Sequence, residues 1–289
     1  MTEKKVIEKR YAKELKVFFR NRLGVIGLLG VAFLLLVALF APLLAENVTG
    51  YGSYQDKLLP PSAAHPMGTD DMALDLYAQV VWGTRASIKV GAISMLVAAL
   101  IGVPIGLVSG FYGKWVDTLG MGITDVFLTI PMLPLMIIAT AMLDRTSINT
   151  VAIIIGLFAW PSIARITRSS TMKCCGLQYI EAARCLGIRN RTIVFRHVLV
   201  NVSTPVFVGL TVVMATSIVA ESAISFLGLG DPLVHSWGKI LHNAYISGAF
   251  SSAWWFSMFP SLGIMLFVIS FNFLSIGIRD ALNPKISRE

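Results

Sequence analysis

The sequence contains one uninterrupted apolar segment, Leu23–Leu44, with no charged residue over 22 positions. At the rise of an α-helix this segment measures about 33 Å, which covers the roughly 30 Å hydrocarbon core of a bilayer. A cleavable signal peptide has an apolar core of only about 7–15 residues. We therefore predict a retained membrane-spanning helix over 23–45, preceded by a basic, amphipathic cytoplasmic segment over 1–22.

The rest of the chain is also poor in charge. Of its 289 residues, 55% are hydrophobic and 14% are charged, whereas soluble domains carry about 25% charged residues. A spanning segment must pair its backbone groups internally, and long apolar segments do so as helices. We predict an all-α polytopic membrane protein with six transmembrane helices. The five further spans are expected at Ile88–Tyr112, Val116–Leu143, Thr150–Ile166, Val200–Leu227 and Phe256–Ile278.

Several of these spans contain helix breakers and small residues. Prolines stand inside three spans, at Pro104, Pro131, Pro134 and Pro161. Proline kinks a spanning helix, and glycines let two helices approach closely. The glycines at 102, 106 and 110 recur at every fourth position. This pattern favours kinked helices packed closely around a path and disfavours a simple membrane anchor or scaffold.

The positions of the basic residues predict the orientation. Nineteen of the 24 Lys and Arg residues fall on one side if the N-terminus is inside, and five fall on the other, at Lys57, Arg85, Lys89, Arg145 and Lys239. Since cytoplasmic segments carry the excess of Lys and Arg, both termini are expected in the cytoplasm. The net charge of +8 is then a signal of topology, and we expect no nucleic-acid partner.

These assignments divide the chain into segments. An extracytoplasmic loop is expected over 46–87 and a core domain with five spans over 88–280, which contains a cytoplasmic loop at about 169–199. A cytoplasmic tail is expected over 281–289. The loop over 46–87 and the outer segment Gly228–Trp255 can contact a substrate or a delivery protein, or form an ordered cap.

The cytoplasmic loop has the pattern of an elbow made of two short helices. Its first half places apolar residues on one helical face, at Leu177, Ile180, Ala183 and Leu186. Gly187 follows, and glycine accepts the left-handed conformation that ends helices. A second helix is expected around Ile193 and Val194. Such an elbow cannot span the membrane and would lie flat at its cytoplasmic face.

The elbow resembles the EAA motif of importer-type ATP-binding-cassette permeases. That motif reads EAA, three residues, Gly, nine residues and I-x-L-P, and it is matched here by Glu181, Ala182, Ala183, Gly187 and Leu199. His197 stands where the motif often has Ile, and Val200 stands where it has Pro. The missing proline leaves open how the elbow joins the fifth span.

Other segments resemble the dipeptide/oligopeptide/nickel permease family, and within it the C-type subunit with a long first outer loop. The matching segments are RNRLGVIGLL, FAPLLA, PPSAAHPMGTD, WVDT, SFLGLG, SWG and GIRDALNP. Two departures lie in outer segments: MALD over 72–75 replaces the usual LGRD, and the segment after SFLGLG is short and lacks a proline pair.

The resemblance implies a type I importer permease fold in the cytoplasmic membrane of a bacterium or an archaeon. It implies four kinds of partner: a second homologous permease, two ATPase subunits, an extracytoplasmic solute-binding protein and membrane lipid. Di- or oligopeptides are the expected cargo, and nickel or a metal–chelator complex is the alternative. Glu181 would stabilise the start of its short helix and contact an ATPase subunit; a purely structural acid is the alternative.

The residues themselves indicate no catalysis in this chain. A phosphate-binding GxxxxGK[ST] loop is absent from the sequence, so ATP and Mg²⁺ are expected on partner subunits and no cofactor on this chain. An ion-coupled secondary transporter is the other mechanism considered, but it would need charged relays or broken repeats at mid-membrane. The three cysteines and four histidines lack the spacing of metal ligands, so no metal site is expected.

Four ionisable residues inside or beside the spans are candidate functional groups. Asp125 is expected to pair with Arg165 or Arg168 and to steady an inner gate; the alternative is an acid that reaches the inner interface. Glu221, far along the fifth span, is expected either to line the outer mouth of the path or to cap SFLGLG by hydrogen bonding.

Overall fold

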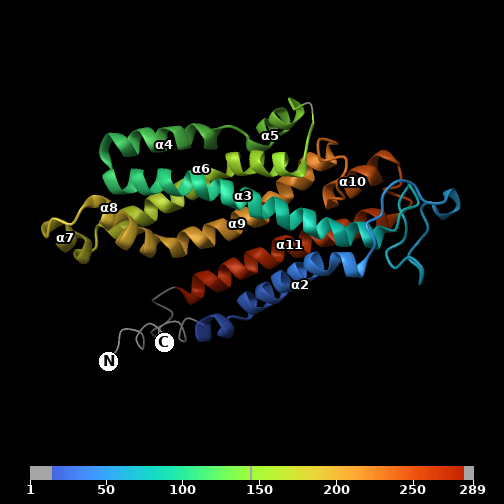
Figure 1. Ribbon diagram of the computed structural model, residues 1–289, viewed down its shortest axis with the longest axis horizontal. Helices are drawn as coiled ribbons and strands as arrows, with labels where there is room; N and C mark the ends of the chain where they lie inside the picture. Colours follow the sequence, from blue (N-terminus) through green and yellow to red (C-terminus); the bar gives the residue numbers. More distant parts are fainter. Residues whose placement is uncertain (1–14, 144, 283–289) are drawn as a thin grey trace.

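Five long apolar helices form a bundle with their axes along its long dimension (Figure 1). The computed structural model describes residues 15–143 and 145–282, and within these ranges every regular element is a helix. The predicted segments 1–22 and 281–289 lie mostly outside the described residues. The five helices are α2 (Arg22–Leu44), α3 (Leu76–Tyr112), α6 (Ile148–Cys175), α9 (Leu199–Phe226) and α11 (Trp254–Ala281).

The third predicted span, Val116–Leu143, is wrong as a single helix. It consists of α4 (Lys114–Thr129) and α5 (Met132–Ala141), whose axes differ by 82°. Pro131 caps α5 and forces the residue before it out of the helical region, so Ile130 is extended at φ −84° and ψ 134°. The described chain therefore has five unbroken candidate spans and a sixth that is bent.

Other boundaries also differ from those predicted. Helix α3 begins twelve residues before Ile88, so the loop assigned to 46–87 ends at Asp75, which caps α3 by accepting from the Ala78 N–H at 3.1 Å. Helix α6 continues nine residues beyond Ile166. Both extensions are amphipathic or polar, and hydropathy alone detects only the apolar part of a helix.

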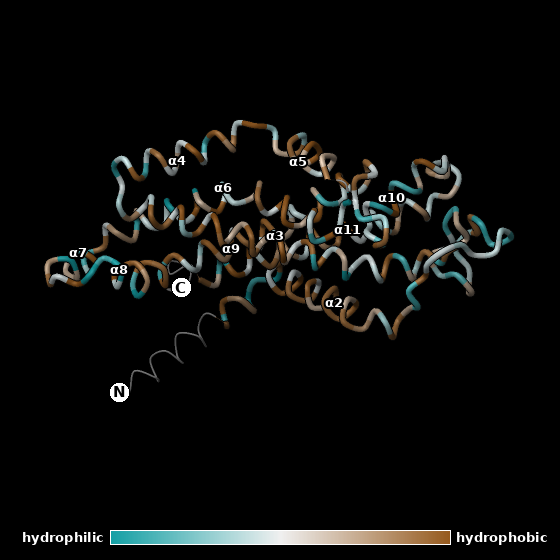
Figure 2. The backbone as a smooth tube through the Cα atoms, turned by 45° about the horizontal axis from the view of Figure 1, so that its top comes forward, coloured by the Kyte–Doolittle hydropathy of each residue, from teal (hydrophilic) through white to brown (hydrophobic). Residues whose placement is uncertain are grey.

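The bundle has two chemically distinct ends (Figures 1 and 2). At one end, here called the elbow end, lie α7 (Gln178–Cys185), α8 (Asn190–Thr192) and the π-helical segment η2 (Ile193–Val198). At the other, the cap end, lie residues 46–75 with the short η1 (Tyr54–Asp56), and α10 (Trp237–Ile246). Hydrophilic residues gather at these two ends, and mostly hydrophobic residues lie along the length between them (Figure 2).

Close glycine contacts hold α3 against α6. A Cβ added at Gly102 would lie 2.6 Å from the carbonyl oxygen of Trp160, and one added at Gly110 would lie 2.7 Å from Cβ of Thr171. Gly106 is equally tight, against Thr167. This stripe of small residues, predicted from the four-residue spacing, lets the two backbones approach as membrane helices do when packing drives their association.

The first span packs on the last. Asn21 caps α2 through the Gly24 N–H at 3.1 Å, and its Nδ2 donates to Asp280 Oδ2 on α11 at 2.7 Å. Gly24 faces Gly277 with backbone against backbone. These contacts give a structural reason for the RNRLG pattern at the start of the first span: the asparagine joins the two helix ends, and the glycine lets them touch.

Candidate functional site

Helix α7 is anchored to the bundle by one apolar face. Ile180 is fully buried and Ala183 is 7% exposed. They pack in one cluster with Leu107 and Phe111 of α3 and with Ile193, where the next helix begins. The elbow therefore packs on the ends of α3 and α6 and on the start of the helix that follows it.

Two polar contacts reinforce this anchoring. The Arg184 guanidinium carbon lies 5.1 Å from the centre of the Phe111 ring, within cation–π range. The Tyr179 hydroxyl lies 3.4 Å from Cys174 Sγ. Burial, with a smaller effect of that contact, raises the pKa of Tyr179 to about 12, so its hydroxyl stays protonated at neutral pH.

The opposite face of α7 is open. Glu181 and Ala182 are exposed, and Glu181 stands in the first turn, where a carboxylate interacts favourably with the helix dipole. Gly187 adopts φ +74° with nothing within 4 Å of its missing Cβ, so glycine is required there for its conformation and not for space. Leu186 beside it is 80% exposed. The open face of the elbow thus carries an exposed acid and an exposed apolar tip.

The second arm of the predicted elbow is not a separate short helix. Residues 190–226 form one continuous helix, through α8, η2 and α9. The Leu199 N–H bonds to the Val194 carbonyl, a π-type step, and Leu199 is half-buried in the same cluster. Val200 is 64% exposed and continues the helix, because a valine there, unlike the motif proline, keeps its N–H.

Two ion pairs join α4 to α6. Arg165 Nη2 donates to Asp125 Oδ1 at 2.6 Å, so these two side chains meet as the sequence predicted. Arg168 instead binds Asp117, with its Nε and Nη2 donating to the two carboxylate oxygens at 2.5 Å each. The pair with Asp117 was missed because Asp117 lies next to a predicted loop. The gate role of Asp125 stays a prediction.

Glu221 does not line an open surface of this chain. It is 2% exposed, and Ser225 Oγ donates to its Oε1 at 2.6 Å. Ser225 begins the SFLGLG segment, so the geometry favours the capping interpretation over the outer-mouth interpretation. The reason is its position on α9. There Glu221 faces Ile148 at the start of α6 and Ser236 in the loop after α9.

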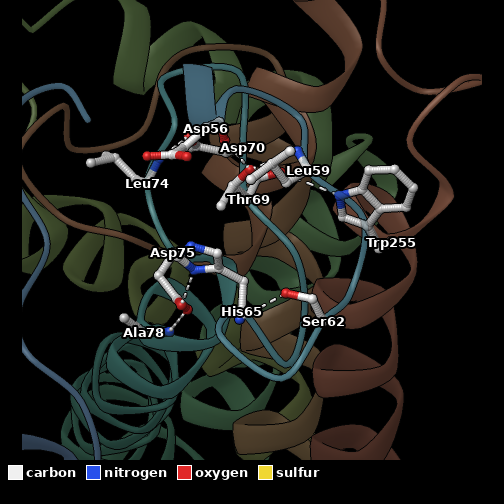
Figure 3. A network of polar contacts seen from close by, with 10 residues as sticks. All are labelled: Asp56, Leu59, Ser62, His65, Thr69, Asp70, Leu74, Asp75, Ala78 and Trp255. Atoms are coloured by element: carbon white, nitrogen blue, oxygen red, sulfur yellow. Dashed lines mark hydrogen bonds and ion pairs between the residues drawn. The ribbon is translucent and has the colours of Figure 1, made fainter. Parts of the chain in front are cut away.

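The cap is ordered, which was one of the two alternatives for this loop, but its hydrogen-bond network was not predicted from the sequence (Figure 3). Asp70 is 1% exposed; its Oδ1 accepts from the N–H groups of Met72 and Leu74 at 2.8 Å, and its Oδ2 accepts from Gln79 Nε2 at 2.6 Å. His65 Nδ1 lies 2.9 Å from Asp75 Oδ2, which ties the cap to the start of α3.

The residues around Thr69 complete this network. Thr69 Oγ1 donates to the Asp56 carbonyl at 2.5 Å and accepts from the Leu59 N–H at 2.8 Å. Trp255 Nε1 donates to the Thr69 carbonyl at 3.2 Å, which links the cap to α11 (Figure 3). The HPMGTD segment is therefore folded onto the starts of α3 and α11, and His65, Thr69 and Asp70 form their hydrogen bonds within the chain.

Comparison with known proteins identifies the family. The model of the binding-protein-dependent transport system inner membrane component matches residues 102–288, and that of the N-terminal transmembrane domain of oligopeptide transport permease C matches residues 13–61. The chain belongs to the binding-protein-dependent transport system inner membrane components. The predicted resemblance and the type I importer permease fold are thereby confirmed.

This chain matches known transport permeases along nearly its full length. The chain is 36% identical over 275 residues to a dipeptide transport system permease protein of Alkalihalophilus pseudofirmus, covering 95% of this chain and 88% of the relative. It is 35% identical over 271 residues to a glutathione transport system permease protein of Pectobacterium atrosepticum, covering 93% and 89%. A dipeptide transport system permease protein of Bacillus subtilis is 33% identical over 270 residues, covering 93% and 84%.

Proposed function

We propose that this chain is a permease subunit of an ATP-driven importer of peptides. The relatives above are named for dipeptide and glutathione transport, which favours short peptides and does not favour the nickel alternative. The observation that carries the proposal is the elbow: α7 buries Ile180 and Ala183 against the bundle and leaves Glu181 exposed. That geometry suits a docking element that is anchored on the bundle and moved by another protein.

The proposed assembly contains a second homologous permease, two ATPase subunits and a solute-binding protein. ATP and Mg²⁺ bind to the ATPase subunits, and this chain is not catalytic and holds no cofactor. We place the elbow end and both termini in the cytoplasm, on the basis of the Lys and Arg distribution. The cap end then faces outward, where the solute-binding protein delivers its peptide.

The mechanism is alternating access. Closure of the ATPase pair moves α7, and the cluster that joins α7 to α3 and α9 makes the ends of these helices move with it. The bundle turns from inward-open to outward-open, the peptide enters, and hydrolysis resets the bundle. Glu181, Ala182 and Gly187 act at the contact with the ATPase, whereas Ala183 and Leu199 hold the elbow on the bundle.

The test is a charge reversal at the elbow. We expect Glu181→Arg to lower peptide uptake at least tenfold, because it places a cation where the partner accepts a carboxylate, a charge-assisted contact worth about 1.5–3 kcal/mol. The measurements are ATP-dependent uptake in proteoliposomes and co-purification of the ATPase subunits. Glu46→Arg, the same reversal at an exposed acid of the cap end, is the control and should leave co-purification unchanged. Normal uptake with Glu181→Arg would refute the docking role.

A further inference from the structure

One face of α4 and α6 carries an ion pair that is open to its surroundings. The side chains of Asp125 and Arg165 are each 56% exposed. They share one hydrogen bond, of 2.6 Å, and within the described residues Arg165 has no second hydrogen-bond partner. A guanidinium has five N–H donors in a planar fork, so most of the donors of Arg165 are available to a ligand.

The neighbouring pair shows what a purely structural pair looks like in the same two helices. Asp117 and Arg168 are joined by two parallel bonds, and their side chains are only 19% and 32% exposed. Both carboxylate oxygens and the matching edge of the guanidinium are used there. The difference in exposure and in unused donors singles out Arg165 as the available cation.

The open pair lies within the span and not beyond its end. A Cβ at Gly209 would lie 2.8 Å from Ile166 Cδ1, so Arg165 is near the level of Gly209. Val208, beside Gly209, accepts from Ser275 Oγ at 3.3 Å. Ser275 is two residues before Gly277, which packs against Gly24 at the start of the first apolar span. The pair is thus at the elbow-end part of the spanning region.

The same face continues into a break in the backbone. Thr129 is four residues after Asp125, on the same side of α4, and Thr129, Ile130 and Pro131 are all exposed. The 82° bend there interrupts the helical hydrogen bonds. Non-helical backbone at membrane depth is tolerated only against protein or a water-filled cavity.

Helix α6 is polar on this side as well. Ser162 and Ser169 flank Arg165 at three residues before and four after, and both are exposed. Charged residues within spans face the bundle interior or water, and broken helices border transport paths in other membrane transporters. The ion pair, the break and the serines together mark a hydrated surface.

We propose that this face lines the elbow-end part of the substrate path, and that Arg165 binds the C-terminal carboxylate of the passing peptide. Asp125 is a positioning residue that holds the guanidinium while its other N–H donors contact the ligand. The chemistry fits, because a guanidinium binds a carboxylate through two parallel hydrogen bonds. The inference rests on the proposed function, since a free carboxylate is common to the peptides such an importer would carry.

The first experiment compares tri-alanine with its C-terminal amide. Uptake by the assembled importer is measured with one solute-binding protein throughout, so that protein's own preference cancels between variants. We expect Arg165→Gln to lower tri-alanine uptake about tenfold or more and to change amide uptake little. The control Arg168→Gln should lower both peptides alike, through stability. Equal losses for both peptides with Arg165→Gln would overturn the inference.

The second experiment tests the exposure of the face directly. Cysteine is placed at Ser162 or Ser169 in a chain whose Cys174, Cys175 and Cys185 are replaced by serine, and labelling by a charged methanethiosulfonate is timed. We expect both sites to react and tri-alanine to slow the reaction more than its amide does, with the difference lost in Arg165→Gln. Cysteine at Ile163, which is fully buried, should not react.

The outcomes separate the two proposals. Unreactive cysteines at both serines, or protection by the peptide that does not depend on Arg165, would refute the path-lining inference even if the importer carries peptides. An assembled wild-type importer that takes up no peptide would refute the proposed function, whatever the labelling shows.

Discussion

At the residue scale, the cap depends on a few buried polar groups with complete hydrogen bonding. Asp70 accepts three hydrogen bonds while only 1% exposed, and Thr69 is fully buried. A buried acceptor is tolerated because its partners are in place, and removing one partner costs more than the bond itself contributes. Glu221 is satisfied at one oxygen only: Ser225 donates to its Oε1, and its buried Oε2 has no hydrogen-bond partner among the described residues.

We predict that Asp70→Asn lowers the free energy of unfolding by about 1–3 kcal/mol. The new amide can accept from Met72 and Leu74, but its NH₂ then faces the NH₂ of Gln79, so the Gln79 amide must flip to offer its oxygen and a charge-assisted bond becomes a neutral one. The double variant with Gln79→Glu restores a charged acceptor and should recover part of the loss. Thermal unfolding of the purified protein in detergent measures both; no recovery would contradict the assignment.

We also predict acid sensitivity at His235. Burial lowers the pKa of His235. The hydrogen bond from Nε2 of His235 to the Val48 carbonyl raises it, and the positive charge of Lys239 lowers it further. The unfolded chain then binds a proton first, so stability is complete above about pH 6.5 and falls as the pH drops toward the folded pKa.

A His235→Gln variant should remove this part of the pH dependence, measured as unfolding midpoints between mildly acidic and neutral pH. The variant is compared with the wild type because Asp71 also changes stability with pH. Burial and the repulsion of Asp70 raise the pKa of Asp71, which gives a stability change of opposite sign at lower pH. An unchanged slope in the variant would show that His235 is not responsible.

At the element scale, small residues determine which helices touch. Helices α3 and α6 meet through Gly102, Gly106 and Gly110, and α2 meets α11 through Gly24. The bend between α4 and α5 is an element-scale event too, because Pro131 sets the conformation of Ile130. The glycine contacts and the bend at Pro131 both follow from the local sequence. The glycine contacts also need a partner helix, whereas the bend does not.

We predict that Gly106→Leu destabilises the protein by about 1–3 kcal/mol or more through overpacking. A side chain there would meet Thr167 at 2.6 Å and the Arg168 nitrogen at 2.9 Å, and neither can move without shifting α6. Gly122→Leu is the matched control, since Gly122 is also helical and has nothing within 4 Å. Equal unfolding midpoints for the two variants would disprove the packing argument.

At the scale of the whole molecule, the elbow and the cap lie at opposite ends of the bundle (Figure 1). Helix α3 connects them with 37 residues, a length of about 55 Å. The cap network joins this helix through Asp75, and the elbow packs on its other end through Phe111. Damage at one end should therefore leave the local contacts of the other intact.

We predict that Gly68→Val impairs the capture of the solute-binding protein without releasing the ATPase subunits. Gly68 has φ +78°, and a Cβ there would lie 2.6 Å from the Leu59 carbonyl and 2.7 Å from the Trp255 ring. Gly50→Val is the control, since Gly50 has φ +87° and open space. Pull-down with each partner checks the result; loss of the ATPase subunits would contradict the separation of the two ends.

The sequence by itself determined five of the six spans, the first arm of the elbow and the family, since a long apolar segment has few ways to satisfy its backbone in lipid and a motif such as EAA needs only local spacing. It also predicted that Asp125 would pair with Arg165 or Arg168, and the observed partner is Arg165. The tertiary structure alone decided that Arg168 binds Asp117, that Glu221 is buried, that α3 begins at Leu76 and that the cap is a closed network. These depend on residues far apart in the chain, and their contacts follow from how the helices pack, which hydropathy and spacing do not specify.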